Sequence, residues 1–327
     1  MDETVETVKP GECLWCRIEA PVPGGYNVTV VKTGMKGFLP ATDRIEIGRA
    51  VPSTFVCMNG DRALFTFAFT MGTSARVQHS TASDKENAFS VWMDAFPKSI
   101  SFRRAVDIVM PPISASSMML KLDEKKAREI ITSLDETRFT GCIKIFCESG
   151  MSRAALIFFR GRAVGSIYTK KPMRDPYPFD AGIRKLMQDL TSENADAEME
   201  MYELPEEIVL SMASLFLGYV DRQDAQGVDK AAYAEKMLEH FATCKETACF
   251  NLVDATDTSA AFGFVHNGEF KGAYTIAEQV YSSEKSFLKE LIEKDPELKL
   301  QVHILPPAMK TDAVILGYSL SSDQFGT

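Results

Sequence analysis

Five short runs of apolar and polar residues follow one another within residues 9–69, and Gly, Pro and Asp separate one run from the next. Val28 and Val30, for example, alternate with polar neighbours, which is the two-residue period of a strand with one buried face. The pattern predicts five strands, at Glu12–Glu19, Tyr26–Lys32, Lys36–Leu39, Ala50–Met58 and Arg62–Phe69. Five short strands in a stretch of this length favour a small closed barrel of the OB-fold type.

A helical pattern follows within residues 71–119, which we interpret as a connector. The stretch Ser83–Glu86 has the spacing of a capping box, which predicts a helix start. Phe89, Trp92 and Phe96 then form one apolar stripe. A helix with such a stripe must bury it, either against a neighbouring domain of the chain or against a partner. The stretch Pro111–Ser117 predicts a linker before the next domain.

One pattern occurs twice in the rest of the chain. Cys142 and Cys249 are 107 positions apart, and so are Gly161 and Gly268. Each copy predicts a helix, three strands, a second helix, a further strand and a final apolar segment that ends in Leu-Gly-Tyr. Self-similarity at a fixed offset indicates an internal duplication.

The final segment of each copy allows two interpretations. A Pro at its start favours a helix, and Ile208, Met212 and Leu215 would share one face of that helix in the first copy. A terminal strand is the alternative for the second copy, where Ala313–Leu316 is continuously apolar.

These elements predict a multidomain protein with an N-terminal all-β, OB-like barrel and two duplicated α+β domains. Each α+β domain would be an antiparallel sheet with helices on one side. The predicted bounds are 1–70 for the barrel, 71–119 for the connector, 120–222 for the first copy and 223–327 for the second.

Composition limits the classes of protein and the cellular compartments that fit this sequence. Of 327 residues, 45% are hydrophobic and 25% charged, so each domain can bury a core. A net charge of −9 argues against wholesale coating of nucleic acid or anionic lipid. Seven cysteines, mostly inside apolar runs, indicate buried free thiols in a reducing compartment. The acidic start Met1–Glu6 is unlike a signal peptide, and the apolar run Ile208–Val220 is too short to span a bilayer. We therefore expect a cytoplasmic protein with no membrane partner.

The sequence shows no catalytic constellation. It lacks phosphate-binding, dinucleotide-binding, zinc-protease, EF-hand and nucleophile-elbow motifs. The four histidines lie in different segments without metal spacing. Cys13 and Cys16 form a CxxC, but in a strand their side chains would point to opposite faces. We therefore expect a non-enzymatic protein with no cofactor and no metal.

Three separated motifs of the first domain, at Gly24–Val28, Gly34–Pro40 and Ile47–Val51, resemble the S1 domain in the form found in the early repeats of ribosomal protein S1. The resemblance implies contact with single-stranded RNA or with the ribosome, through bases stacked on aromatic side chains beside cations. Protein docking is the alternative that the early ribosomal repeats also imply. The candidate RNA-binding residues are Lys32, Lys36, Phe38 and Arg44.

The first copy also resembles the PATAN/DUF4388 family, at Thr140–Ile145, at Phe158–Gly165 and in the helix that follows. The resemblance implies a bacterial, non-enzymatic interaction module. The first copy carries a basic hairpin region that the second lacks. Its candidate contacts for an anionic partner are Arg153, Arg160, Arg162, Lys170 and Lys171.

Together these observations predict a bacterial cytoplasmic adaptor or regulatory protein without catalytic activity. Its S1-like module would contact RNA or the translation machinery, and its duplicated module would contact protein. The alternative is a signalling scaffold that binds only protein, which Gly24, Asn27 and Pro40 favour, because RNA-binding S1 domains commonly carry two aromatics and a His there. The partner, the pathway and the oligomeric state stay open.

Overall fold

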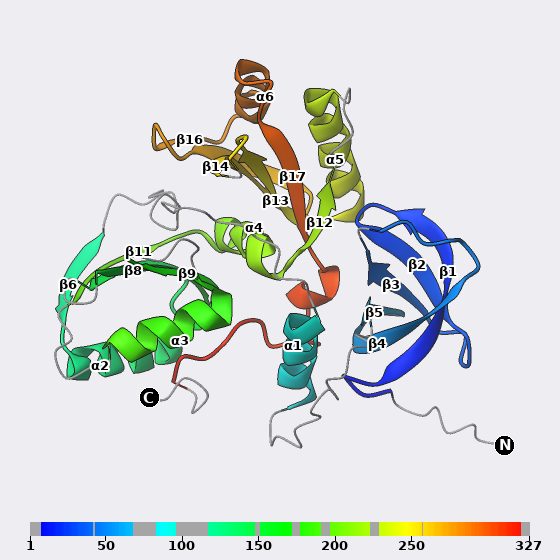
Figure 1. Cartoon of the computed structure of the whole chain (residues 1–327), viewed down its shortest axis with the longest axis horizontal. Helices are drawn as coiled ribbons and strands as arrows, with labels where there is room; N and C mark the ends of the chain where they lie inside the picture. The colour runs from blue at the N-terminus through cyan, green and yellow to red at the C-terminus, as the bar shows by residue number, and fades with distance from the viewer. Residues whose placement is uncertain are drawn as a thin grey trace. The chain divides into compact units, whose positions relative to one another are not determined.

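The structure, a computed structural model, is shown in Figure 1. It describes residues 8–41, 43–67, 83–95, 117–147, 151–171, 177–190, 197–222, 229–256 and 258–321. The chain divides into two units. The first consists of Met1–Pro97, Tyr219–Asp221 and Pro306–Leu316, and the second of Lys98–Gly218, Arg222–Leu305 and Gly317–Thr327. Phe96 of the predicted helix and all of the predicted linker except Ser117 lie outside the described residues.

The first unit is built on the barrel that the alternation predicts. Its strands are β1 (Cys13–Val22), β2 (Gly25–Val30), β3 (Lys36–Pro40), β4 (Ala50–Asn59) and β5 (Arg62–Phe67). They close in the order β1-β2-β3-β5-β4, and every pair is antiparallel except β3 with β5. Inward-pointing residues such as Ile18, Val28 and Phe65 are at most 1% exposed and fill the barrel. The closed five-stranded architecture is OB-like.

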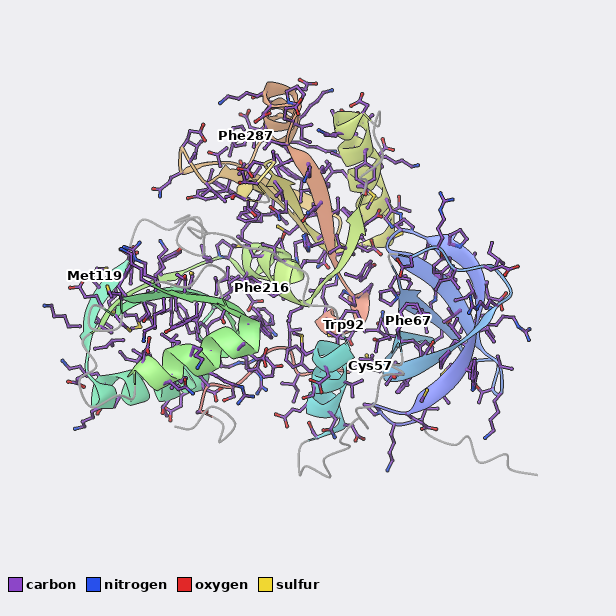
Figure 2. All side chains as sticks on the ribbon, in the orientation of Figure 1. Cys57, Phe67, Trp92, Met119, Phe216 and Phe287 are labelled. Carbon is purple, nitrogen blue, oxygen red and sulfur yellow. The ribbon has the colours of Figure 1, made fainter. Side chains whose placement is uncertain are left out.

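Helix α1 (Asp84–Ala95) belongs to the same unit and lies against β4 and β5. Its predicted aromatic stripe is buried at Phe89 and Trp92, and Trp92 is labelled in Figure 2. The 3-10 helix η2 (Pro307–Lys310) contacts β4, and Ile315 donates its N–H to the carbonyl of Lys85 at 3.3 Å. Phe89 and Trp92 therefore pack within the chain, which is the first of the two predicted alternatives.

The second unit contains most of two sheet domains. The strands of the first are β6 (Met118–Leu122), β7 (Gly141–Cys147), β8 (Ser152–Phe159), β9 (Arg162–Lys170), β10 (Tyr177–Pro178) and β11 (Ala197–Glu203). They form one sheet in the order β10-β9-β8-β7-β11-β6. Helices α2 (Glu124–Glu136) and α3 (Phe179–Leu190) lie over one face, where Leu134 and Leu186 share a core with Ile143 and Leu156.

The second sheet domain has the same plan. Its strands are β12 (Tyr219–Arg222), β13 (Thr247–Val253), β14 (Ser259–His266), β15 (Glu269–Thr275), β16 (Val280–Ser282) and β17 (Lys299–Leu305). Helix α5 (Lys230–Cys244) precedes β13, and helix α6 (Lys285–Lys294) precedes β17. The ring of Phe241 in α5 lies 6.0 Å from that of Phe250 in β13, so α5 covers the face to which Phe250 points.

Strand order is common to the two sheets. The second has the order β12-β17-β13-β14-β15-β16, which, read from its other end, matches the first element for element. The turns match as well, because Gly161 donates its N–H to the Phe139 carbonyl and Gly268 donates its N–H to the Glu246 carbonyl, both at 2.7 Å. Sequence reasoning missed β6, β10, β12 and β16, which are the two edge strands of each sheet.

Helix α4 (Glu206–Leu217) lies between the two sheets, and Ile208–Leu217 are all buried. It contacts β8 and β9 of one sheet and β13, β14 and β17 of the other. The Phe216 ring of α4 (Figure 2) lies over Gly165, where a Cβ atom would stand 2.4 Å from it. Gly165 pairs with Ile157, whereas Leu156 points toward α2 and α3. Because neighbouring residues of a strand point to opposite faces, α4 covers the other face. The prediction that helices cover only one face of each sheet is therefore wrong for the first sheet, because α4 covers its second face.

The final segments of the two domains differ. The first forms the predicted helix, α4, whereas the second has only η2, and Ala313–Leu316 form neither helix nor strand. The strand alternative is wrong there, because Ile315 gives its N–H to Lys85 rather than to a sheet. Although most of α4 is buried, neither it nor any other helix among the described residues has the length and apolarity that crossing a membrane requires.

Candidate nucleic-acid interface on the barrel

Two of the barrel's cations lie in one row across three strands. Arg17 of β1 pairs with Thr29 of β2, and Thr29 pairs with Lys36 of β3. Paired residues of neighbouring strands point to the same face of a sheet, so the exposed Arg17 and Lys36 side chains share the outer surface. Lys32, also predicted as an RNA contact, is exposed in the turn between β2 and β3. Arg44 is exposed in the connection between β3 and β4 and does not belong to this row.

An apolar row lies beside the cations. Trp15 of β1 is 59% exposed, and the adjacent Val31 is 50% exposed. Val31 donates its N–H to the Trp15 carbonyl at 2.8 Å, and Trp15 pairs with the partly exposed Pro52 of β4. Trp15 and Arg17 are two residues apart on β1, so their Cα atoms are about 6.5 Å apart on the same face. We name Trp15, Arg17, Val31, Lys36 and Pro52 the Trp15 face.

Sequence reasoning missed Trp15, although the sequence held a signal for it. Cys16 and Ile18 alternate with the charged Arg17 and Glu19, so the two-residue period of the strand places Trp15 in the outward phase, and Cys16 and Ile18 are indeed fully buried. A large aromatic residue in the outward phase of a strand is unusual enough to notice. Glu19 follows in the same outward phase and is exposed, so the positive charge of β1 is confined to its Trp15 end.

Phe38, the predicted stacking residue, has an aromatic neighbour within the first unit. Its ring centroid lies 5.1 Å from that of Tyr219, and the two planes are inclined by 51°. Tyr219 also fills the space above Gly24, where a Cβ atom would stand 2.1 Å from the Tyr219 ring. Asn27 accepts a hydrogen bond from Arg62 at 2.6 Å. The Phe38 side of the barrel is therefore covered by the chain itself, whereas the Trp15 face is exposed.

The CxxC shows the predicted geometry. Cys13 is exposed and Cys16 is buried, so their side chains point to opposite faces of β1. Burial raises the pKa of the Cys16 thiol to about 11 and that of Cys57 to about 12, which disfavours the nucleophilic thiolate. Within the described residues, no three His, Cys, Asp or Glu side chains gather in a way that could hold a metal ion.

Most of the basic candidates of the first sheet domain bind groups of the chain itself. Arg160 donates two hydrogen bonds to Glu206, both at 2.9 Å, and these bonds raise the pKa of Arg160 and lower that of Glu206. Arg162 donates to the Gly317 carbonyl at 2.9 Å, and Lys170 lies 3.3 Å from Asp189. The remaining two are Arg153, which stacks on Phe146 at 5.2 Å, and the exposed Lys171. Their role toward an anionic partner stays a prediction.

A scan of the sequence against protein-family models finds no match, and a search of curated proteins finds none either.

Proposed function

We propose that the barrel binds single-stranded RNA through the Trp15 face. The observation that carries the proposal is the exposed Trp15 ring in an apolar row, directly beside the cationic row of Arg17 and Lys36. A base can stack on the indole while the phosphates on either side of it meet the cations. The OB-like barrel and the S1 resemblance support the same reading.

We propose further that the two sheet domains arose by duplication, are PATAN/DUF4388-like and contact protein. The common strand order and the equal turn hydrogen bonds at an offset of 107 residues support the duplication. The whole chain would then be a bacterial adaptor that joins RNA or the translation machinery to a protein partner without catalysing a reaction.

The test is a filter-binding titration of the whole chain with single-stranded oligouridylate at about 50 and 200 mM salt. With the two cations of the Trp15 face engaged, we expect micromolar binding that weakens about sevenfold between the two salt concentrations. Trp15→Ala should weaken binding about tenfold, because one stacked base is lost. Met58→Ala is the matched control, because Met58 is also an exposed large apolar residue of the barrel, 37% exposed, but stands outside the Trp15 face.

A scaffold that binds only protein is the second candidate, and the cover that Tyr219 gives Phe38 favours it. Trp and Arg side chains are also the commonest hot spots of protein interfaces. If the chain retains no oligouridylate at low salt, the RNA proposal is wrong and the scaffold is supported.

A further inference from the structure

The chain's last described residues, 317–321, lie against the first sheet domain. Tyr318 and Ala163 exchange two backbone hydrogen bonds, at 2.8 and 2.9 Å, and form an isolated antiparallel bridge. Ala163 is near the start of β9, whereas the short edge strand β10 pairs only with Ile167 and Tyr168 further along. The segment thus adds itself to a part of the β9 edge that β10 leaves open, which is how extended peptides dock on sheets.

Side chains on both sides of this bridge hold the segment in a defined register. Arg162 donates to the Gly317 carbonyl at 2.9 Å. The Asp135 carboxylate of α2 accepts hydrogen bonds from the hydroxyls of Ser319 and Ser321, at 2.8 and 2.9 Å. These contacts favour a particular sequence, because the segment must present one hydroxyl just before position 320 and one just after it.

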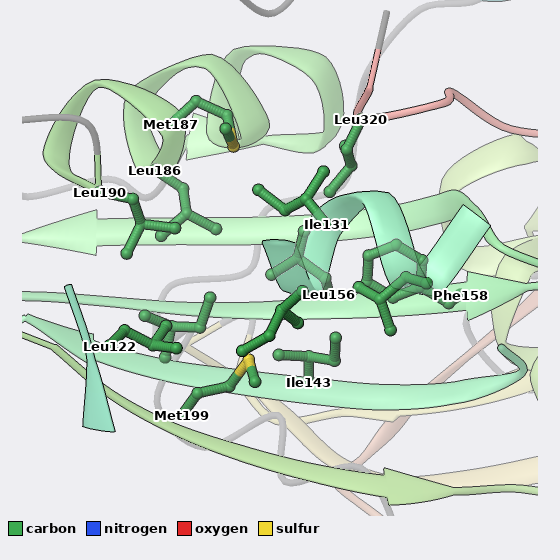
Figure 3. Close-up of a pocket in the computed structure, with 13 residues that line it drawn as sticks. Leu122, Ile131, Ile143, Leu156, Phe158, Leu186, Met187, Leu190, Met199 and Leu320 are labelled. Atoms are coloured by element: carbon green, nitrogen blue, oxygen red, sulfur yellow. The ribbon is translucent and has the colours of Figure 1, made fainter. Parts of the chain in front are cut away.

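Gly317 and Leu320 give the segment its shape. Gly317 has φ +87°, and a Cβ atom there would stand 2.7 Å from the Ala163 carbonyl oxygen, so only glycine fits without strain. The Leu320 side chain is 4% exposed, belongs to the core of this domain and helps to line an apolar pocket beneath α2 and α3 (Figure 3). The lining of this α2–α3 pocket is apolar throughout and includes Leu134, Leu156, Leu186, Met187 and Leu190. With Leu320 in place, a cavity of about 20 Å³ is left, room for about one water molecule.

The second sheet domain lacks the chemistry of this site. The position 107 residues after Asp135 is Ala242, which cannot accept a hydroxyl hydrogen bond with its side chain. The position after Arg162 is Glu269, which pairs with Lys271 at 2.8 Å and has the opposite charge. The arrangement is therefore specific to the first domain rather than a general consequence of the fold.

We propose that the β9 edge and the α2–α3 pocket form a peptide-recognition site, held closed by the chain's own residues 317–321. Its partner is an extended protein segment with the same chemistry: a glycine and an aromatic residue for the β9 edge, a leucine for the pocket, and serines beside that leucine for Asp135. The inference deepens the protein-contacting half of the proposed function by naming the kind of partner. Residues 317–321 act in cis at a high effective concentration, so a partner binds when this segment is displaced.

The test uses a fluorescent peptide with the sequence of residues 317–322, Gly-Tyr-Ser-Leu-Ser-Ser, with acetyl and amide ends. We expect no binding by the whole chain and saturable binding by a variant that ends at Leu316, measured by anisotropy. Asp135→Ala in the shortened chain should weaken binding about tenfold, because two hydrogen bonds to a carboxylate are lost. Glu136→Ala is the matched control. It removes the same charge from the exposed neighbouring position on α2, which forms no hydrogen bond with residues 317–321 among the described residues.

If the shortened chain fails to fold, the full-length double variant Tyr318→Ala with Leu320→Ala takes its place, with folding checked by circular dichroism. A folded chain of either kind that ignores the peptide would overturn the proposal. Unfolding of both variants would also overturn it, because the segment would then be an inseparable part of the core. So would an exchanged dimer of the whole chain, seen by light scattering, since the occupant would then be a second copy. None of these results depends on RNA, so the barrel's proposed function is judged separately.

Discussion

The β8–β9 turn passes through Arg160 and Gly161, and the β14–β15 turn through Asn267 and Gly268, with φ values of 49° and 85° in the first and 48° and 80° in the second. The two turns have the same backbone conformation, yet their side chains make different contacts. Arg160 forms an ion pair with Glu206, whereas Asn267 contacts the ring of His266. Residues that fix the path of the chain recur between the two sheet domains, while those that meet other groups differ. We therefore expect the contacts that carry function to lie at positions where the side chains of the two domains differ.

The largest expected effect tests the shared backbone. Gly161→Ala and Gly268→Ala should each lower the free energy of unfolding by about 2–3 kcal/mol, because both positions have positive φ and an added Cβ would meet backbone. The Cβ would stand 2.8 Å from the Leu134 carbonyl oxygen in the first case and 2.5 Å from that of Phe241 in the second. Gly60→Ala is the control, since Gly60 has φ +62° but open space around it, and about 1 kcal/mol is expected. Urea unfolding measures all three, and unequal losses at the two turns would break the comparison.

A second effect tests how α4 holds the second sheet. The Ser211 hydroxyl donates to the Ala248 carbonyl at 2.6 Å and accepts from the Val265 N–H at 3.2 Å. Ser211→Ala should cost about 1.5 kcal/mol, because it leaves buried backbone groups without that partner. Ser214→Ala, equally buried on the same helix, removes only a bond to the Leu210 carbonyl and should cost less than about 0.5 kcal/mol. Equal losses in thermal unfolding would show that Ser211 has no special role.

A smaller effect sharpens the difference between the turns. Arg160→Asn gives the first turn the residue of the second and should cost about 0.5 kcal/mol at pH 7, because the pair with Glu206 is about half exposed and screened by solvent. Hydrogen bonding to Arg160 lowers the pKa of Glu206 from its ordinary value of 4.5. The stabilisation is therefore present above pH 4.5 and is lost as the pH falls through the lowered pKa. Urea midpoints at pH 7 and pH 3 check this, and a cost that persists at pH 3 would contradict the ion pair.

The smallest effect concerns Tyr274 of β15, whose counterpart 107 positions earlier is Ile167. The Tyr274 hydroxyl is buried without a hydrogen-bond partner among the described residues. Tyr274→Phe should therefore change the free energy of unfolding by less than about 0.5 kcal/mol in either direction. A loss above about 1 kcal/mol would mean that a bound water or ligand uses this hydroxyl. Calorimetry of the two proteins decides the matter.

Local pattern explains which parts of the fold could be predicted. The barrel strands are short β-type runs bounded by turn residues, with clear alternation in β2, and both glycine turns mark their hairpins, so these elements were predictable from neighbouring residues. The edge strands were not, because Met118–Leu122 has no alternation of its own and becomes a strand by pairing with β11. Helix α4 and the short η2 both follow a Leu-Pro pair, so the local sequence does not distinguish them. The longer helix is favoured by its packing between two sheets, which depends on residues far away in the sequence.

The same limit applies to the candidate sites. Lys36 was predictable from its place in a strand, and Trp15 could have been found from the phase of β1. The cover of Phe38 by Tyr219 could not, since 181 positions separate the two residues. The hydrogen bond from Arg162 to the Gly317 carbonyl joins residues 155 positions apart, so no local sequence pattern predicts it.

The fluorescence of Trp15 tests the central claim most directly. The chain has two tryptophans, and Trp92 is fully buried, so Trp92→Phe leaves the exposed Trp15 as the sole indole reporter. Titration of this variant with oligouridylate at low salt should quench the emission saturably, with a midpoint that matches filter binding and rises with salt. Emission that stays unchanged while RNA is retained on the filter would place the RNA elsewhere and contradict the account.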